Sequence, residues 1–201
     1  VFETVPLILG FDLSPDGNTL YAGDQNYDGI LKVDLTTGVV ESVYLPTPAS
    51  NYTFLDVDLD AANGLLYLLQ EDTIGANSYA LGKVGTDGSN PEIIVENDEA
   101  SGELQPEGLA LDITNDRAFV ADRLGGTHAV NLTSYAVTDV GATAGTFGVG
   151  LSFSPTDDAI YYPRESAPPG DMQSVRVSDG TVTNYAGVEA GFAMDLLVPR
   201  E

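Results

Sequence analysis

One two-segment pattern recurs four times along the chain and sets the limits on its fold. In the clearest copy, Pro106 to Asp122, two apolar segments flank a polar turn at Thr114 to Asp116. Each copy has one aromatic residue in its second segment: Tyr21, Tyr67, Phe119 and Tyr161. The spacings between these aromatics are 46, 52 and 42 residues. Short apolar segments joined by polar turns are typical of antiparallel strands, so the chain is predicted to be a repeated β structure.

A strand-built repeat of this length is typical of a β-propeller, in which each blade is a four-stranded antiparallel sheet. We therefore expect an all-β fold without helices. The predicted second strand of the first blade begins at Thr19, and its third covers Ile30 to Leu35. The four predicted blades cover about residues 10–45, 55–95, 108–140 and 150–186.

The two ends of the sequence predict strands that have no complete blade of their own. Residues 1–7 resemble residues 39–45, which form the predicted outer strand of the first blade, and residues 191–196 repeat the inner-strand pattern. We assign residues 1–9 and 191–199 to an incomplete fifth blade of a single propeller domain or segment. Either the chain is part of a five- or six-bladed propeller, or a partner chain supplies the missing strands.

Several motifs resemble known propeller repeats. The sequence Pro106-Glu-Gly-Leu-Ala-Leu-Asp112, followed by Arg117-Ala-Phe-Val-Ala-Asp122, resembles the YWTD repeat of the low-density-lipoprotein-receptor class B family. The turn Ser14-Pro-Asp-Gly-Asn18 and the ending Asp34-Leu-Thr-Thr-Gly38 resemble those of NHL and YVTN propellers. The resemblance implies propeller architecture over nearly the whole chain.

The charge balance restricts the partners. Thirty-one acidic residues oppose seven basic ones, which gives a formal net charge of −24. Such a surface repels nucleic acid and anionic membranes. No apolar run approaches the roughly 20 residues of a membrane span. We expect an extracellular or cell-surface protein, with a surface suited either to a high-salt or marine setting or to cation binding.

One segment has the opening of a calcium loop. Asp24, Asn26 and Asp28 alternate before Gly29, as the first oxygen ligands of an EF-hand loop do. The closing acids of that motif are absent. Calcium is therefore the one cofactor this sequence suggests, and a polar hairpin turn without metal is the alternative.

A second acidic group is predicted on inner strands. Asp56, Asp58 and Asp60 alternate along one strand and would share one face, and Glu107 begins the inner strand of the third blade. Asp56 and Glu107 would then lie near the rim of a central channel, where calcium-dependent lactonases of similar architecture hold their metal.

The repeat register offers a structural interpretation of the same acids. Asp60 and Asp112 occupy the position of Ser14 and Ser154, directly before the turn of each copy. Short polar side chains there cap a turn by bonding to nearby backbone groups.

Motifs for nucleophilic catalysis are lacking. The chain has no cysteine, His128 is its single histidine, and it contains no Gly-x-Ser-x-Gly sequence. No catalytic residue is predicted. Asn51-Tyr-Thr53 and Asn131-Leu-Thr133 match the N-glycosylation pattern.

The sequence favours a secreted or surface-exposed propeller module that binds a protein or glycan partner through inter-blade loops or its channel face. One alternative is a calcium-dependent propeller hydrolase that acts on a lactone or ester. Another is a self-assembling module that pairs its open terminal strands between chains.

Overall fold

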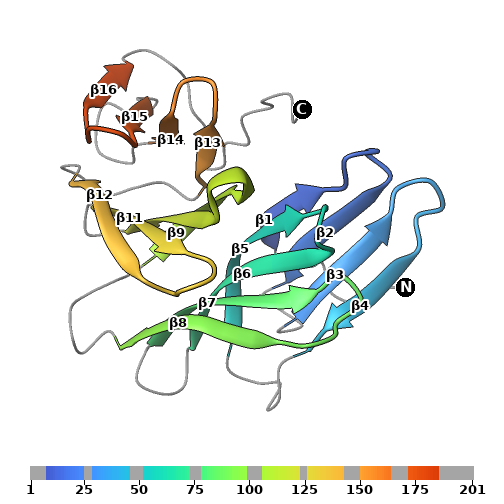
Figure 1. Ribbon diagram of the computed structural model, residues 1–201. Coiled ribbons are helices and arrows are strands. Elements are labelled where there is room, and N and C mark those ends of the chain that lie inside the picture. The colour runs from blue at the N-terminus through green and yellow to red at the C-terminus, as the bar shows by residue number, and fades with distance from the viewer. Residues whose placement is uncertain are drawn as a thin grey trace. The chain divides into compact units, whose positions relative to one another are not determined.

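In the computed structural model, the regular secondary structure of the described residues is almost entirely β-strand. Within its described residues the chain forms four antiparallel sheets of four strands each (Figure 1). In the described part of the chain, the 3-10 turn η2 (Ile113–Asn115) interrupts this pattern. The described residues are 8–24, 29–45, 52–72, 78–98, 106–122, 126–142, 150–163 and 172–185.

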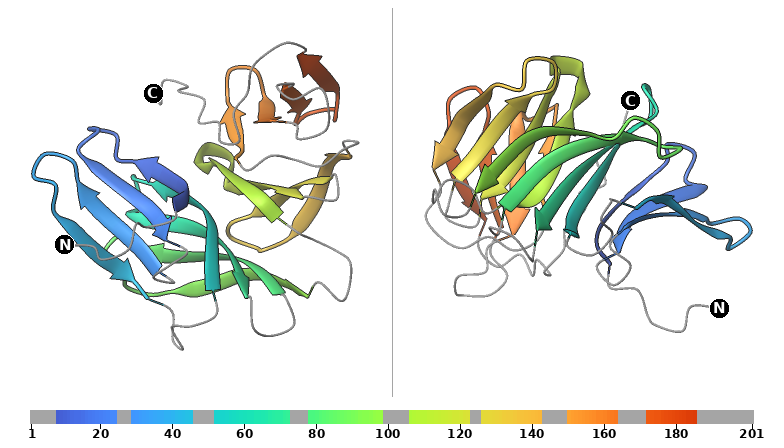
Figure 2. Two further views of the ribbon diagram at one scale, coloured as in Figure 1. Left: turned by 180° about the vertical axis from the view of Figure 1, so that it is seen from behind. Right: turned by 90° about the horizontal axis from the view of Figure 1, so that it is seen from below.

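The first half of the chain forms sheets 1 and 2, each with its strands in chain order (Figure 2). Sheet 1 contains β1 (Ile8–Leu13), β2 (Thr19–Asp24), β3 (Gly29–Asp34) and β4 (Val40–Tyr44). Sheet 2 contains β5 (Tyr52–Asp60), β6 (Leu65–Asp72), β7 (Ser78–Gly85) and β8 (Glu92–Asp98).

The second half repeats this arrangement in sheets 3 and 4. Sheet 3 contains β9 (Pro106–Asp112), β10 (Arg117–Asp122), β11 (Gly126–Asn131) and β12 (Val137–Ala142). Sheet 4 contains β13 (Ser152–Ser154), β14 (Ala159–Pro163), β15 (Met172–Arg176) and β16 (Val182–Tyr185).

The predicted all-β class is confirmed, and several strand positions agree closely. The second strand begins at Thr19, as predicted, and β3 lies within one residue of the predicted range. The inner strand β1 begins at Ile8, two residues before the predicted Gly10. Residues 1–7 and 186–201 lie outside the described residues, so the incomplete fifth blade stays a prediction.

Burial explains why the middle strands are apolar while the outer ones are mixed. The last four residues of β2 are all buried, because side chains on both of its faces are covered. On β4, Glu41 and Ser42 are exposed. A strand covered on both faces needs a continuous apolar run, whereas an outer strand tolerates polar residues.

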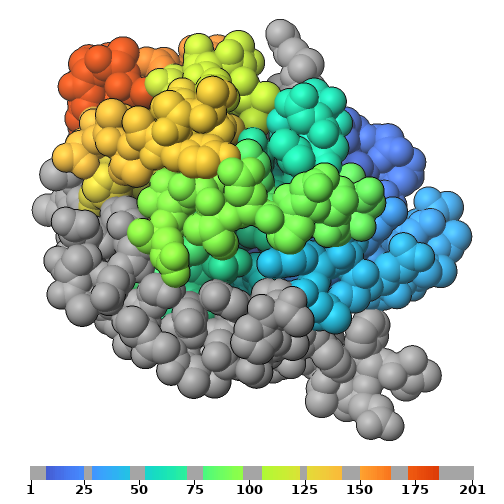
Figure 3. All heavy atoms as spheres, turned by 60° about the horizontal axis from the view of Figure 1, so that its bottom comes forward, coloured from blue at the N-terminus to red at the C-terminus, as the bar shows by residue number. Residues whose placement is uncertain are grey.

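The chain divides into two compact units, Val1–Glu103 and Leu104–Glu201. In the first unit, Tyr21 and Ile30 of sheet 1 pack against Phe54, Val57 and Leu66 of sheet 2. Figure 3 shows the atoms of sheet 1 (blue) against those of sheet 2 (cyan to green).

The two sheets of the first unit approach so closely at Gly10 that a Cβ there would lie 2.4 Å from the Cα of Asp56. A buried hydrogen bond joins the same sheets, since the Leu59 backbone N–H donates to Asp12 Oδ2 at 2.9 Å. Glycine at position 10 and the carboxylate at position 12 therefore hold sheet 1 against sheet 2.

In the second unit the core lies between sheets 3 and 4. Phe119 and Ala121 of β10 belong to one buried cluster with Leu151, Ile160 and Val175. The Phe119 ring also contacts Phe153, with ring centroids 5.0 Å apart. Both units thus bury an aromatic residue of one sheet against aliphatic side chains of the next.

Candidate functional site

The turn between the first and second strands is capped in all four sheets by a side chain at one repeat position. The Ser14 hydroxyl accepts from the Thr19 N–H at 2.9 Å, and the Ser154 hydroxyl accepts from the Asp157 N–H at 3.3 Å. Asp60 accepts from the N–H and the side-chain amide of Asn63, at 3.1 and 2.7 Å. The predicted capping role of this position is confirmed for Ser14, Asp60 and Ser154.

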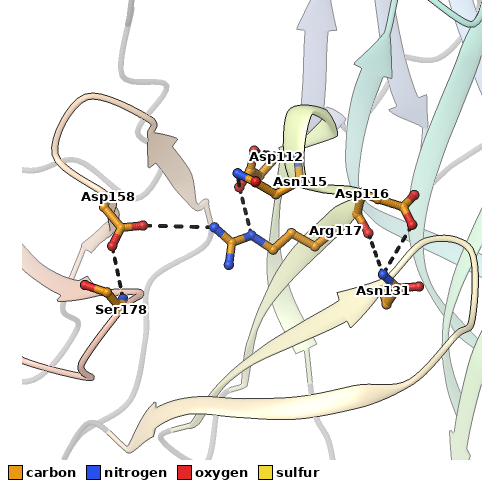
Figure 4. Close-up of polar contacts among 7 residues, drawn as sticks. All are labelled: Asp112, Asn115, Asp116, Arg117, Asn131, Asp158 and Ser178. Atoms are coloured by element: carbon orange, nitrogen blue, oxygen red, sulfur yellow. Dashed lines mark hydrogen bonds and ion pairs between the residues drawn. The ribbon is translucent and has the colours of Figure 1, made fainter.

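Asp112 occupies the same position in sheet 3 and is the most heavily bonded of the four caps (Figure 4). It accepts from the backbone N–H of Asn115 at 3.3 Å and from the Asn115 amide at 2.9 Å. It also pairs with Arg117 Nε at 2.8 Å. The carboxylate is almost completely buried, and all three donors lie within five residues of it in sequence.

A second hydrogen bond recurs in every sheet and ties the end of the third strand to the same turn. Its donors are the first residues after these strands, and the donor–acceptor pairs are Leu35–Asn18, Thr86–Gly64, Leu132–Asp116 and Val177–Asp158. The N···O distances are 2.8, 2.9, 2.9 and 2.8 Å. This end of each sheet, which we call the capped end, therefore has a fixed backbone that does not depend on side-chain identity.

The turns between the third and fourth strands complete the capped end. Asp34 Oδ1 accepts from the backbone N–H groups of Thr36 and Thr37, at 2.8 and 2.9 Å. Asn131 Oδ1 does the same for Thr133 and Ser134 in sheet 3. The turn closes on a residue with positive φ, which is Gly38 in sheet 1 and Tyr135 in sheet 3.

Carboxylates at the capped end stay ionised far below neutral pH. The Ser14 hydroxyl, aided by Asn18, lowers the pKa of Asp16 to about 2. The pKa of Asp34 is lowered mainly by the Thr37 N–H, and that of Asp87 mainly by the Ser89 hydroxyl. These carboxylates of the capped end therefore keep their negative charge, and each already accepts hydrogen bonds from its own turn.

Arg117 links the capped turns of the two sheets in the second unit (Figure 4). Besides its bond to Asp112, its Nη2 lies 4.0 Å from Asp158 Oδ1. Its guanidinium carbon lies 4.9 Å from the ring centroid of Phe119, a distance typical of cation–π contact. Asp158 in turn accepts from the Ser178 N–H at 3.1 Å. Sequence reasoning missed this role, because the repeat pattern does not place side chains of neighbouring sheets.

Two tyrosines on sheet 4 form a polar aromatic surface. The rings of Tyr161 and Tyr185 lie 6.2 Å apart, and the Tyr161 hydroxyl donates to Asp157 at 3.1 Å. Partial burial, followed by the hydrogen bond to Asp157, raises the pKa of Tyr161 to about 12. The Tyr185 hydroxyl lies 3.3 Å from Ser174 Oγ.

The predicted calcium loop is only partly within the described residues. Asp24 is fully buried at the end of β2, opposite Gly29 of β3 and Ile8 of β1. Asn26 and Asp28 lie outside the described residues. Calcium binding by these three residues therefore stays a prediction.

The predicted channel-rim acids belong to different units. Asp56 lies in β5 and accepts from the Val57 N–H at 2.9 Å, and Glu107 lies in β9. Asp56, Asp58 and Asp60 do alternate along β5, opposite Leu69, Tyr67 and Leu65. Among the described residues, no group of three or more His, Cys, Asp or Glu side chains is placed to hold a metal ion.

His128 and Asn131 have partners in sheet 3. His128 Nδ1 lies 2.8 Å from Asp139 Oδ1 across strands β11 and β12. The Asn131 amide nitrogen donates to the carbonyl and to the carboxylate of Asp116, both at 3.2 Å. The amide of this predicted glycosylation site is therefore engaged in structure, and Asn51 lies outside the described residues.

No protein-family model and no curated protein sequence matches this chain. Solved structures do match. The chain aligns to the crystal structure of a nidogen/laminin complex with a TM-score of 0.75 and 13% identity, over 94% of this chain and 68% of that one. The chain has a β-propeller fold. Each of the four sheets corresponds to one blade.

Two further solved structures align with most of this chain. A Bacteroides thetaiotaomicron protein of unknown function aligns with a TM-score of 0.71 and 14% identity, over 94% of this chain and 46% of that one. TolB from Acinetobacter baumannii aligns with a TM-score of 0.67 and 11% identity, over 89% and 43%. The chain thus spans about half the length of these two proteins, and the likeness concerns the fold. Among the described residues, no helix is long and apolar enough to cross a membrane.

Proposed function

We propose that this propeller is an extracellular binding module and that it meets a protein or glycan partner at the ends of its sheets opposite the capped end. These opposite ends carry the connections between second and third strands and the connections between successive sheets. They include residues 25–28, 73–77 and 123–125, which lie outside the described residues.

The proposal rests on one observation: polar side chains and backbone groups at the capped end form hydrogen bonds with one another within the protein. Every first-to-second-strand turn there is capped, and the same backbone bond recurs in all four sheets. Groups already bonded within the protein gain little by turning to a partner. The loops at the opposite ends carry no repeated motif, and loops positioned by a rigid scaffold often carry binding residues.

One matched structure is that of a complex between two proteins, nidogen and laminin. That fact concerns those proteins, and it supports a protein partner here only through the shared fold. The charge of −24 further favours a partner with a basic or neutral contact surface. Within the described residues no observation favours the calcium-dependent hydrolase over the binding module.

The proposal is tested by screening the purified chain against arrays of extracellular proteins and glycans, with affinities of the hits measured by biolayer interferometry. A loop variant replaces residues 123–125 with Gly-Ser-Gly. The matched control carries Thr36→Lys and Thr133→Lys on exposed turns of the capped end. We expect a saturable partner whose affinity falls at least tenfold in the loop variant and stays within twofold in the control. The absence of any saturable partner, or the reverse pattern, contradicts the proposal.

A further inference from the structure

The capped turn of sheet 2 contains the single Asn-Gly sequence of the chain, Asn63-Gly64. The side-chain amide of an asparagine can be attacked by the backbone nitrogen of the residue that follows. Glycine in that place hinders the attack least, because it has no side chain and a permissive backbone. Asn63 is exposed, so water reaches it. This turn therefore brings together the groups that a deamidation requires.

Two hydrogen bonds to Asp60 hold Asn63 in place. The Asn63 backbone N–H donates to Asp60 Oδ1 at 3.1 Å, and its amide nitrogen donates to Asp60 Oδ2 at 2.7 Å. Asp60 itself is 3% exposed. Both bonds direct Asn63 toward a residue that precedes it, whereas the attacking nitrogen belongs to the next residue, Gly64. The Asp60 cap therefore opposes the reaction, which needs the amide to leave Asp60.

The capped turn of sheet 3 provides a comparison within the same chain. Asn115 is also exposed, and it makes the same two bonds to Asp112, at 3.3 and 2.9 Å. The following residues have similar backbone conformations, with φ of +65° at Gly64 and +55° at Asp116. The two asparagines thus share their cap and differ in the residue that follows. Because Asp116 has a side chain that hinders the attack, Asn115 should react more slowly than Asn63.

We propose that Asn63 is a site of spontaneous deamidation and that the product releases the Asp60 cap. The Gly64 nitrogen attacks Cγ of Asn63, a C–N bond forms, and the bond from Cγ to Nδ2 breaks. The proton of the Gly64 nitrogen leaves with the amide group as ammonia. Water then opens the cyclic imide at either of its two carbonyl carbons, which leaves aspartate or isoaspartate at position 63.

The aspartate product puts a second carboxylate in the place of a donor. A hydrogen bond of 2.7 Å to Asp60 is then replaced by repulsion between like charges beside a buried carboxylate. In none of the four described first-to-second-strand turns does an acidic cap face an acid three residues later. In sheet 4, where Asp157 has this position, the cap is Ser154, whose hydroxyl donates to the Asp157 carboxylate at 2.9 Å. An acid at position 63 therefore suits a serine cap and not an aspartate cap.

The isoaspartate product changes the backbone itself. It inserts one extra methylene group between the Cα of residue 63 and the nitrogen of Gly64. The Gly64 carbonyl accepts from the Thr86 N–H at 2.9 Å, the bond that recurs at every capped end. A longer backbone displaces this carbonyl from Thr86. Both products thus weaken the capped end of sheet 2, and neither effect depends on the partner of the proposed function.

The first experiment follows deamidation at mildly alkaline pH by peptide mass spectrometry, with isoaspartate detected by enzymatic methylation. In the folded chain we expect Asn63 to convert severalfold faster than Asn115, and more slowly than in the same chain denatured in guanidinium chloride. Asp60→Ala should speed conversion of Asn63 about fivefold, the factor that corresponds to loss of a capping side chain. Asp60→Asn, which lacks the second carboxylate oxygen, replaces it if circular dichroism shows that Asp60→Ala unfolds.

The second experiment measures Tm of variants that mimic the aspartate product. Asn63→Asp should lower Tm by at least about 4 °C. Combining it with Asp60→Ser copies the Ser154–Asp157 pair and should recover at least half of that loss. The matched control is Ala62→Asp, which adds the same charge at an exposed residue of the turn without replacing a donor to Asp60. This control should lower Tm less than half as much as Asn63→Asp.

The opposite results overturn the proposal. For the reaction, these are no conversion of Asn63 in the folded chain by the time the denatured chain has converted, equal rates at Asn63 and Asn115, or an unchanged rate without the cap. For the product, they are an unchanged Tm in Asn63→Asp, no recovery in the double variant, or an equal loss in the control. Because neither experiment involves a binding partner, failure here leaves the proposed binding function intact.

Discussion

Replacing Asp112 with alanine should strongly destabilise the second unit. The change removes the acceptor of one backbone N–H, one amide and the Arg117 guanidinium, at 3.3, 2.9 and 2.8 Å. Loss of a capping side chain costs about 1 kcal/mol, and loss of a charged hydrogen bond costs about 1.5–3 kcal/mol. Arg117 keeps partial access to water, with 26% of its side chain exposed, so the full penalty of an unpaired buried charge does not apply. The expected loss is about 3 kcal/mol.

The assay is thermal and urea unfolding followed by circular dichroism at fixed salt. For a chain of this size, about 3 kcal/mol lowers Tm by roughly 6–12 °C. The matched control is Ser154→Ala at the equivalent position of sheet 4. This change removes the cap on the Asp157 N–H and the hydrogen bond from the Ser154 hydroxyl to the Asp157 carboxylate, but no ion pair, and about 1 kcal/mol is expected. If both variants lose the same free energy of unfolding, the ion pair with Arg117 does not make the Asp112 cap more stabilising than the Ser154 cap, and the reasoning is refuted.

Two further predictions concern close packing and pH. Gly10→Ala should lower the free energy of unfolding by at least about 2 kcal/mol by urea titration, because its Cβ would lie 2.4 Å from the Asp56 Cα. Gly38→Ala, with open space but φ of +73°, should cost only about 1–2 kcal/mol, and a larger loss there than at Gly10 would contradict this account. The pKa of Asp16 is about 2 in the folded chain, below its ordinary 3.8. Its ionised form therefore adds stability above about pH 4 that is lost as the pH falls toward 2, and Asp16→Asn should flatten the stability-against-pH curve in that window.

The repeat pattern was enough to predict the strands because it fixes local spacing. The distance from each cap to the aromatic of the second strand is seven residues in all four copies, Ser14 to Tyr21 in the first and Asp112 to Phe119 in the third. This constant spacing predicted both the start of β2 and the capping role of Asp60. Such features depend on residues that lie near each other in sequence.

Contacts between neighbouring sheets could not be predicted in this way. The hydrogen bond from the Leu59 N–H to Asp12 and the ion pair between Arg117 and Asp158 depend on how one sheet packs on the next. Phe11 and Val57 have the same place in the pattern, and only the packing makes one exposed and the other buried. Asp24 looked like the start of a surface loop, but it lies fully buried at the end of β2 because that strand is covered on both faces.

The central claim is that each of the four equivalent sheets has a capped end with a fixed backbone. Residue-resolved hydrogen–deuterium exchange tests it through the amides of Leu35, Thr86, Leu132 and Val177, which lie in turns outside the strands. The account predicts that all four are protected to nearly the degree of the neighbouring strand amides. Exchange of these amides at the rate of unbonded turn residues would contradict it.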